Sequence, residues 1–196
     1  MGCIIDETLK WKGHAEYLNN KIRSLIHKFY LLREIMNQKT LIMIYKSLIE
    51  SILRYAIEIW GGIYDNALHA LTISHKYLIK TMLKRSRYYP TALLYTNEIV
   101  DIRTLYIVCV TSYIRFKLKP NTINHIYSTR KKINKNIPTN INKNEVHARS
   151  TNYLGIKMYN VLPNTICKIP KPHTFREKCK TYVLNNKDIF SIIFSR

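Results

Sequence analysis

Residues 39–62 read KTLIMIYKSLIESILRYAIEIWGG, and this stretch decides the fold class. Lys46, Glu50, Arg54 and Glu58 recur at every fourth position, so on a helix they form a stripe of alternating charge in which neighbours attract weakly. Apolar side chains fill most of the remaining circumference: Leu41, Ile44, Tyr45, Leu48, Ile52, Tyr55, Ile59 and Trp60. Such a helix has to be covered on most sides, so we expect the other helices to be arranged around it.

Signals at both ends bound this predicted helix. Asn37 is of a residue type that caps helix N-termini. Gly61-Gly62 is expected to end the helix, because glycine tolerates a left-handed turn. The regularly spaced charges argue against a membrane span, which needs about 20 largely uncharged residues. The simplest role of the stretch is that of a buried structural helix, and we expect no membrane partner.

Helical patterns flank the central stretch on both sides. Apolar residues at helical spacing predict a helix over residues 16–36, antiparallel to the central helix and joined to it by a tight turn. After the central helix, Asp65 or Asn66 is expected to cap a third helix that runs to about Leu83.

Two more helices complete this region. A short one is predicted over residues 91–97, and Asp101 is expected to cap another that runs through Leu118. The inward side of the latter is predicted to carry Leu105, Val108, Cys109, Tyr113 and Phe116. The fold class is therefore mainly α, and residues 15–118 are predicted to form an antiparallel helix bundle.

The ends of the chain read differently. Residues 1–14 are predicted to contain a short strand and a turn before the first helix. Residues 119–152 are rich in Asn, Lys and Ile and lack an apolar period, so we expect a long, mobile, basic linker, or a low-complexity linker from an AT-rich gene. Residues 153–196 form a C-terminal block.

Within that block the sequence predicts three features. Alternation over residues 153–160 favours a short strand or turn. Leu162-Pro163 and Pro170-Lys171-Pro172 frame an extended segment. Thr174 and Glu177 have the spacing of a capping box, which predicts a last helix from there to about Asn185.

Net charge is the strongest compositional signal. The 196 residues carry 32 Lys and Arg against 12 Asp and Glu, a formal charge of +20 that favours polyanions such as nucleic acid or anionic lipid surfaces. The net charge rises along the chain, from +3 in residues 1–62 to +6 in residues 63–120 and +11 in residues 121–196. AT-rich codons also supply Lys, so codon bias is the competing explanation. The gradient favours nucleic-acid contact.

The candidate contact residues are chosen by local charge density. The first group ends the third predicted helix: Lys80, Lys84, Arg85 and Arg87, followed by Tyr88-Tyr89. Cations there also suit the helix dipole, which is the structural explanation, whereas cations next to tyrosines are how proteins hold single strands. The second group is Arg130, Lys131, Lys132 and Arg149.

No catalytic centre emerges from the sequence. Asp6-Glu7 is the only adjacent acidic pair and lacks a third partner, and the seven histidines are dispersed. The four cysteines are far apart and predict neither a disulfide framework nor a zinc site. We expect no metal and no cofactor. No secretory signal is visible, so we expect an intracellular protein.

Four sets of residues follow one another as landmarks along the chain. The first set is Gly2 to Asp6, Leu9-Lys10-Trp11 and His14. The second is Leu53, Tyr55, Trp60 and Gly61, and the third is the basic stretch before a proline in residues 76–90. The last set is His147, Arg149, Tyr153, Gly155 and Asn160-Val161-Leu162-Pro163. Together they resemble the reverse transcriptases of non-LTR (LINE, jockey-like) retrotransposons: in order, the segment just after that family's catalytic motifs, its "Leu-x-Tyr…Trp-Gly" helix, its next helix and its terminal block.

This resemblance implies the thumb and the following region of an RNA-directed DNA polymerase, with residues 1–14 as a remnant of the end of the palm. The thumb would grip a template–primer duplex through its phosphates. The sequence departs from the family at Ala56, where glycine is usual, and at Met1, where leucine is usual. The palm's paired aspartates lie upstream of everything present here, so no catalytic residue is carried over.

The sequence leaves three hypotheses open. The chain is a nucleic-acid-gripping fragment of a transposable-element polymerase, inactive by itself, or a non-enzymatic helical module that binds protein or RNA, or a decayed open reading frame. Apolar surface left uncovered in a fragment would favour a protein partner.

Overall fold

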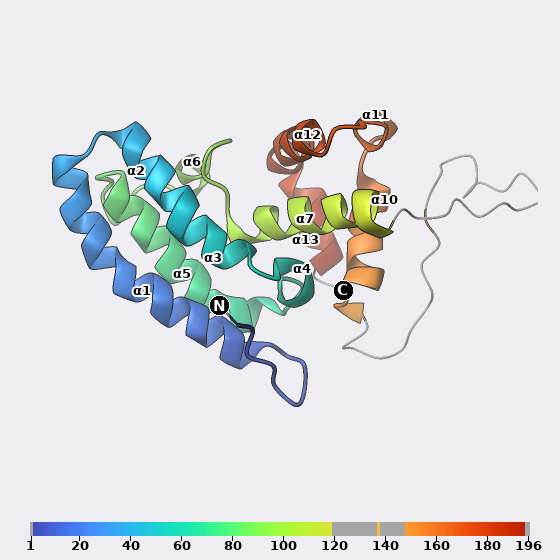
Figure 1. Ribbon diagram of the computed structural model, residues 1–196, viewed down its shortest axis with the longest axis horizontal. Helices are drawn as coiled ribbons and strands as arrows, with labels where there is room; N and C mark the ends of the chain where they lie inside the picture. The colour runs from blue at the N-terminus through green and yellow to red at the C-terminus, as the bar shows by residue number, and fades with distance from the viewer. Residues whose placement is uncertain (1, 119–136, 138–147, 195–196) are drawn as a thin grey trace, which may run out of the picture. The chain divides into compact units, whose positions relative to one another are not determined.

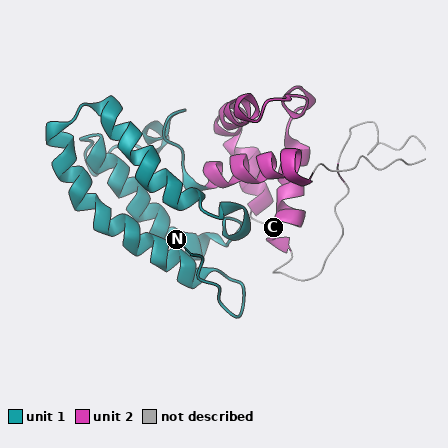
Figure 2. Ribbon diagram, in the orientation of Figure 1, with its two compact units in different colours: residues 1–102 teal, residues 103–196 magenta. Residues whose placement is uncertain are grey.

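The computed structural model describes residues 2–118, 137 and 148–194, and these contain helices and no strand (Figure 1). The predicted mainly α-helical fold class is confirmed. The chain divides into two compact units, Met1–Ile102 and Arg103–Arg196 (Figure 2). This division falls inside the predicted 15–118 bundle. Among the described helices, none is both long and apolar enough to cross a lipid bilayer.

Two long helices form the frame of unit 1. α1 spans Lys12–Ile35 and α5 spans Asp65–Met82, and they pack along each other (Figure 1). The buried residues of both helices follow the helical spacing predicted from the sequence: Ile22 and Phe29 on α1, and Leu71 and Leu78 on α5. The shorter elements are α2 (Gln38–Tyr45), the π-helical segment η1 (Lys46–Glu50), α3 (Ser51–Arg54), α4 (Ile57–Trp60) and α6 (Thr91–Leu94).

The predicted continuous helix over residues 39–60 is wrong. Its start is correct, because Asn37 caps α2 by accepting a hydrogen bond from the Thr40 amide at 2.9 Å. The helix then ends at Arg54, and Ala56 adopts a left-handed conformation with φ 51° before α4 begins. The break redirects the chain so that Ile57 and Trp60 are both fully buried. Burial of these two side chains outweighs the continuity of the helix.

The expectation that this stretch is covered on most sides is also wrong. Leu41, Tyr45, Ile52 and Trp60 are buried, whereas Leu48, Tyr55 and Ile59 are exposed at 45%, 44% and 58%. Of the charge stripe, Arg54 and Glu50 form an ion pair at 2.8 Å. Gly61 has φ −67°, and no described glycine has a positive φ, so the expected left-handed glycine turn is absent there.

The N-terminal segment forms the predicted turn but no strand within residues 2–11. Asp6 organises this turn. Its carboxylate accepts hydrogen bonds from the amides of Lys10 (2.8 Å) and Lys12 (3.2 Å), and its carbonyl accepts one from the Leu9 amide (3.0 Å). Lys12 begins α1, so the carboxylate lies where the positive end of the helix dipole favours an anion.

Other predicted helix boundaries need small corrections. α5 begins at Asp65 and its cap position is Tyr64, so neither Asp65 nor Asn66 is the cap. α6 ends at Leu94, three residues earlier than predicted. The helix after Asp101 is α7 (Ile102–Tyr113), continued by the π-helical segment η2 (Ile114–Leu118). Leu105, Val108 and Cys109 are buried there as predicted, whereas Tyr113 is 38% exposed.

α7 is the helix around which unit 2 is built. The other elements of the unit are η3 (Thr151–Gly155), α10 (Ile156–Val161), α11 (Asn164–Cys167), α12 (Pro172–Asn185) and α13 (Lys187–Phe194). Thr111 of α7 contacts Cys179 of α12 at 3.4 Å, and the ring of Tyr106 lies 6.1 Å from that of Phe194 on α13. The predicted linker over residues 119–152 lies mostly outside the described residues.

Three predictions for the C-terminal block are wrong. Residues 153–160 are helical, because Leu154 and Met158, four positions apart, are both buried on one side. α11 occupies the predicted extended segment. α12 begins at Pro172, two residues before the supposed cap Thr174, and ends at Asn185 as predicted. α13 was not predicted at all.

Candidate nucleic-acid interface

The first group of predicted contact residues lies where α5 ends. Lys84 adopts a left-handed conformation with φ 53° just after the helix. The Arg85 amide donates to the Lys80 carbonyl at 2.9 Å, and the Lys84 amide donates to the Thr81 carbonyl at 3.3 Å. This pair of bonds is the Schellman arrangement that closes helix C-termini. The cap brings all four predicted cations into one turn, which we call the basic turn (residues 80–89).

Two of the four cations hold the basic turn in place. Lys80 Nζ donates to the Arg87 carbonyl at 2.7 Å. Lys84 Nζ forms an ion pair with Glu34 Oε2 of α1 at 2.9 Å. The hydrogen bond from Lys84 lowers the pKa of the Glu34 carboxyl from its usual value. The anchoring role of Glu34 was missed from the sequence, because no local pattern links residues 50 positions apart.

The neighbouring helix strengthens the same anchor. Arg33 Nη1 donates to the Thr81 carbonyl at 3.0 Å, one of the carbonyls at the end of α5. Within the turn, the Tyr89 amide donates to the Ser86 carbonyl at 3.1 Å. The backbone of the basic turn is thus fixed on both sides and does not need to be ordered by a ligand.

The other two cations of the turn face solvent. Arg85 and Arg87 are exposed, and neither has an acidic partner among the described residues. The Arg85 guanidinium lies over the Tyr89 ring, 5.0 Å from its centroid. Tyr88 is 91% exposed, the highest fraction among the exposed apolar and aromatic side chains. A phosphate and a nucleobase would therefore both find suitable groups here.

The second predicted group is not brought to this turn. Arg130, Lys131 and Lys132 lie outside the described residues. Arg149 Nη2 donates to the Phe194 carbonyl at 2.8 Å, at the C-terminal end of α13. A cation is favourable at that end of a helix, so Arg149 has a structural role in unit 2.

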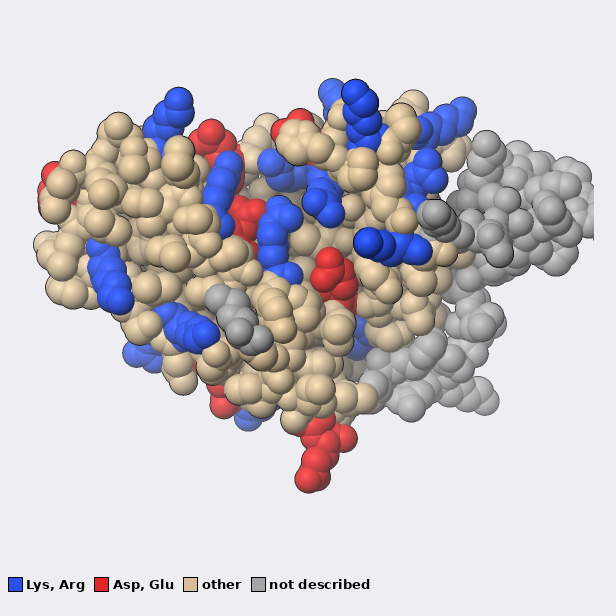
Figure 3. Space-filling view, in the orientation of Figure 1, with Lys and Arg blue, Asp and Glu red and all other residues tan. Residues whose placement is uncertain are grey.

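Unit 2 carries exposed basic residues that we did not single out from the sequence. Lys168, Lys171 and Lys178 are exposed around α11 and α12, and Figure 3 shows basic side chains gathered over these helices. Lys171 is the N-cap residue of α12, and Lys178 lies further along the same helix. Local charge density over residues 168–180 was the signal that would have found these lysines.

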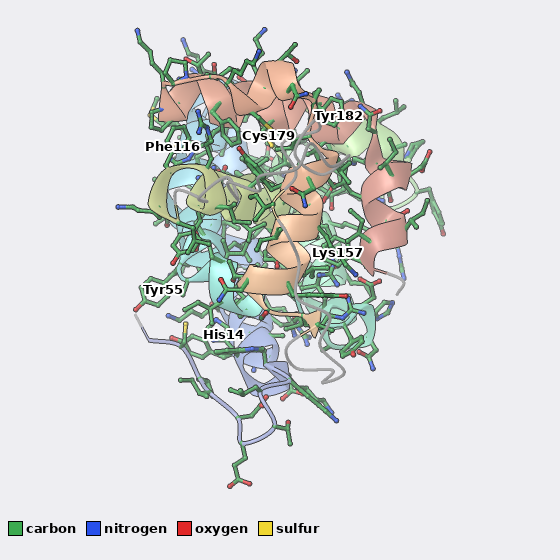
Figure 4. All side chains as sticks on the ribbon, turned by 90° about the vertical axis from the view of Figure 1, so that its right-hand side faces the viewer. His14, Tyr55, Phe116, Lys157, Cys179 and Tyr182 are labelled. Carbon is green, nitrogen blue, oxygen red and sulfur yellow. The ribbon has the colours of Figure 1, made fainter. Side chains whose placement is uncertain are left out.

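The N-terminal residues that carry the family resemblance pack together in unit 1. The buried ring of His14 meets the edge of the Trp60 ring at a centroid distance of 5.5 Å. Trp60 Nε1 donates to the Tyr55 carbonyl at 2.9 Å, which fixes the chain at the break before α4. His14 and Tyr55 are labelled in Figure 4. Burial lowers the pKa of His14, so its ring is a neutral packing element at neutral pH.

The C-terminal residues of the resemblance also have structural roles. Asn160 Nδ2 donates to the Ile137 carbonyl at 2.8 Å, and its Oδ1 accepts from the Ile137 amide at 3.0 Å. Gly155 lies against α7, where a Cβ atom would come 2.7 Å from Cγ2 of Val110. Lys157, labelled in Figure 4, places its ammonium 4.2 Å from the centroid of the Tyr153 ring.

The described residues contain no group of three or more His, Cys, Asp or Glu side chains able to hold a metal ion. Tyr45 Oη and His75 Nε2 form a buried hydrogen bond of 2.6 Å, and burial lowers the pKa of His75 to about 4. Burial raises the pKa of the Cys179 thiol to about 11, so that thiol is unreactive at neutral pH. These groups belong to the core.

The fold and the basic turn define the chain as a helical protein with a fixed cationic surface. No protein-family model matches it, and neither the curated proteins nor the solved structures contain a match.

Proposed function

We propose that this chain binds nucleic acid through the basic turn, as the thumb-like part of a retrotransposon reverse transcriptase (RNA-directed DNA polymerase). The reverse-transcriptase origin rests on the sequence landmarks at residues 2–14, 53–61, 76–90 and 147–163. The binding itself rests on the structure of the turn. It requires no metal and no cofactor.

One observation carries the proposal: Arg85 and Arg87 face solvent on a turn whose backbone is already fixed. Lys80, Lys84 and Glu34 hold the turn, so the two guanidinium groups are free for phosphate oxygens. Arg is suited to phosphate because its planar donors form paired hydrogen bonds. Codon bias explains an excess of Lys, but not this division of roles among four neighbouring cations.

The test is the salt dependence of binding. We expect a labelled oligonucleotide to bind the full chain with an affinity that falls about 10³-fold between about 50 and 200 mM salt, as for about six phosphate contacts. Replacing Arg85 and Arg87 with Gln should reduce the slope of log affinity against log salt by about 2. Fluorescence anisotropy gives both quantities.

A matched pair of lysines provides the control. Lys39 and Lys46 are exposed on α2 and η1, and their replacement with Gln removes the same two charges elsewhere in unit 1. This control should leave the slope nearly unchanged. If both double variants reduce the slope equally, the binding is diffuse and the basic turn is not the interface.

Polymerase activity is not expected from the chain by itself. The family's catalytic aspartates have no counterpart in this sequence, so a purified sample should add no nucleotide to a primed template. Metal-dependent extension of the primer would overturn the proposal. A palm-encoding frame directly upstream in the genomic DNA would support the fragment origin.

A protein-binding role is the second candidate. Met43, Leu48, Tyr55 and Ile59 are exposed on successive elements of unit 1, and exposed apolar side chains in number are typical of protein contacts. If the chain binds nucleic acid weakly and with an affinity that does not depend on salt, the protein-binding role is favoured. If no protein partner is found either, the hypothesis of a decayed open reading frame is favoured.

A further inference from the structure

Tyr88 lies beside the proposed phosphate contacts, Arg85 and Arg87. None of the contacts among the described residues gives its side chain a role in stabilising the fold. Its side chain is 91% exposed, in a turn whose other aromatic residue, Tyr89, lies under the Arg85 guanidinium. Exposing a whole aromatic ring to water is costly, and a ring held out from a fixed backbone loses little entropy when a ligand covers it.

We propose that the basic turn recognises single-stranded nucleic acid, with Tyr88 stacking on an unpaired base while Arg85 and Arg87 contact the adjoining phosphates. This inference rests on the proposed function and adds the part of the nucleic acid that the turn contacts, which is an unpaired stretch such as the one adjoining a template–primer duplex, and not the duplex itself. Aromatic residues next to cations hold single strands in this way, because every base presents a face for stacking. In a duplex the bases are already stacked on each other and cannot cover the ring.

The geometry of the basic turn gives its two tyrosines, Tyr88 and Tyr89, different roles. The Tyr89 amide donates to the Ser86 carbonyl, and its ring packs under Arg85 at 5.0 Å, so Tyr89 positions a phosphate-binding group. Tyr88 precedes Tyr89 directly, so it carries an accessible ring next to that group. The residue before it, Arg87, has its carbonyl tied to Lys80 Nζ, so the backbone leading into Tyr88 is also held.

The experiment compares strands that differ only in their bases. Three labelled probes of about 12 nucleotides are used: a single strand, the same strand with abasic sites, and the blunt duplex. We expect the full chain to bind the single strand about 10-fold more tightly than the abasic strand or the duplex. Tyr88→Ala should abolish that preference, whereas Tyr88→Phe should retain it, because phenylalanine stacks without the hydroxyl.

Tyr55→Ala is the matched control. Tyr55 is also exposed, but it lies in the break before α4, at the opposite end of α5, an 18-residue helix about 27 Å long. This variant should keep the preference for the single strand. Circular dichroism verifies that each variant is folded, and the abasic comparison on the unmodified chain needs no variant.

The outcomes separate this inference from the proposed function. Equal binding of the base-containing and abasic strands by the unmodified chain would overturn stacking, even if Arg85→Gln with Arg87→Gln still reduces the salt slope. An unchanged preference in Tyr88→Ala would assign the stacking to another residue and overturn it too. Failure of the arginine variant to change binding would overturn the proposed function itself.

Discussion

At the scale of single residues, the backbone of this chain is strained where glycine is missing. Four described residues other than glycine have positive φ: Leu9, Trp11, Ala56 and Lys84. Ala56 is informative, because the resembling reverse transcriptases usually carry glycine there. Its φ is 51°, in the left-handed region that glycine adopts without the steric cost that alanine has there.

Ala56→Gly should therefore stabilise unit 1 by about 1 kcal/mol, because it relieves the left-handed strain of an alanine. Ala70→Gly is the matched control, since Ala70 lies exposed inside α5, where glycine should cost about 1 kcal/mol. Urea unfolding followed by circular dichroism measures both changes. Destabilisation by both substitutions would show that position 56 is not held in the left-handed region in solution.

The buried His75 predicts a pH dependence of stability. Its pKa is lowered from 6.5 to about 4, chiefly by burial, with Lys76 adding to the effect and Asp101 opposing it. The unfolded chain therefore binds the proton at a higher pH than the folded chain. His75 destabilises the fold as pH falls from about 6.5 towards 4, by about 3 kcal/mol in total.

Two variants isolate this contribution, because His14 also has a lowered pKa and acts in the same direction. In His75→Leu the loss of stability between pH 6.5 and about 4 should be smaller than in the unmodified chain. In Tyr45→Phe, which removes the 2.6 Å hydrogen bond to His75, the pH dependence should persist although stability falls by about 1 kcal/mol. Urea midpoints measured across this range give the comparison.

At the scale of elements, periodicity located the long helices but not the breaks. α1 and α5 follow a single apolar period, so the sequence predicted them to within a few residues. The stretch over residues 39–60 has a helical period as well, yet it breaks after Arg54. The reason is long-range, because Trp60 is buried against His14 of α1 and its Nε1 bonds to the Tyr55 carbonyl. No local pattern contains that information.

The packing of η3 on α7 gives the third prediction. A Cβ at Gly155 would lie 2.7 Å from Cγ2 of Val110 and 3.0 Å from Cδ1 of Ile114, so Gly155→Ala should destabilise by about 1–3 kcal/mol. Adding Val110→Ala should recover part of that loss by making room for the new methyl group. A double-mutant cycle on thermal unfolding measures this coupling.

Gly13→Ala is the control for the packing argument. A Cβ at Gly13 in α1 would meet Cγ2 of Ile4 at 3.7 Å, an ordinary contact, so alanine should stabilise the helix by about 0.5–1 kcal/mol. If the two glycine substitutions had the same sign, the close approach of η3 to α7 would not be what requires Gly155.

At the scale of the whole molecule, the sequence predicted the helical class and the place of the basic turn. Charge density alone marked Lys80, Lys84, Arg85 and Arg87, and the structure brings them together. Charge density does not distinguish a cation that holds the turn from one that faces solvent. That distinction depends on Glu34, on another helix, and on the left-handed backbone at Lys84. Neither is visible in a local pattern.

The division into two units gives the last prediction. The polar contacts and ring packing that fix the buried side chains of unit 1, such as Tyr45 with His75 and His14 with Trp60, lie within residues 1–102. We therefore expect a fragment of residues 1–102 to be helical by circular dichroism and to unfold cooperatively in urea.

This fragment contains the complete basic turn with its anchor Glu34, so it should retain the preference for a single strand over an abasic one. Its overall affinity should be lower and less dependent on salt, because residues 1–102 carry 14 Lys and Arg against 9 Asp and Glu, only +5 of the chain's net charge of +20. A fragment that is unfolded, while the full chain is folded, would show that the two units are stable only together.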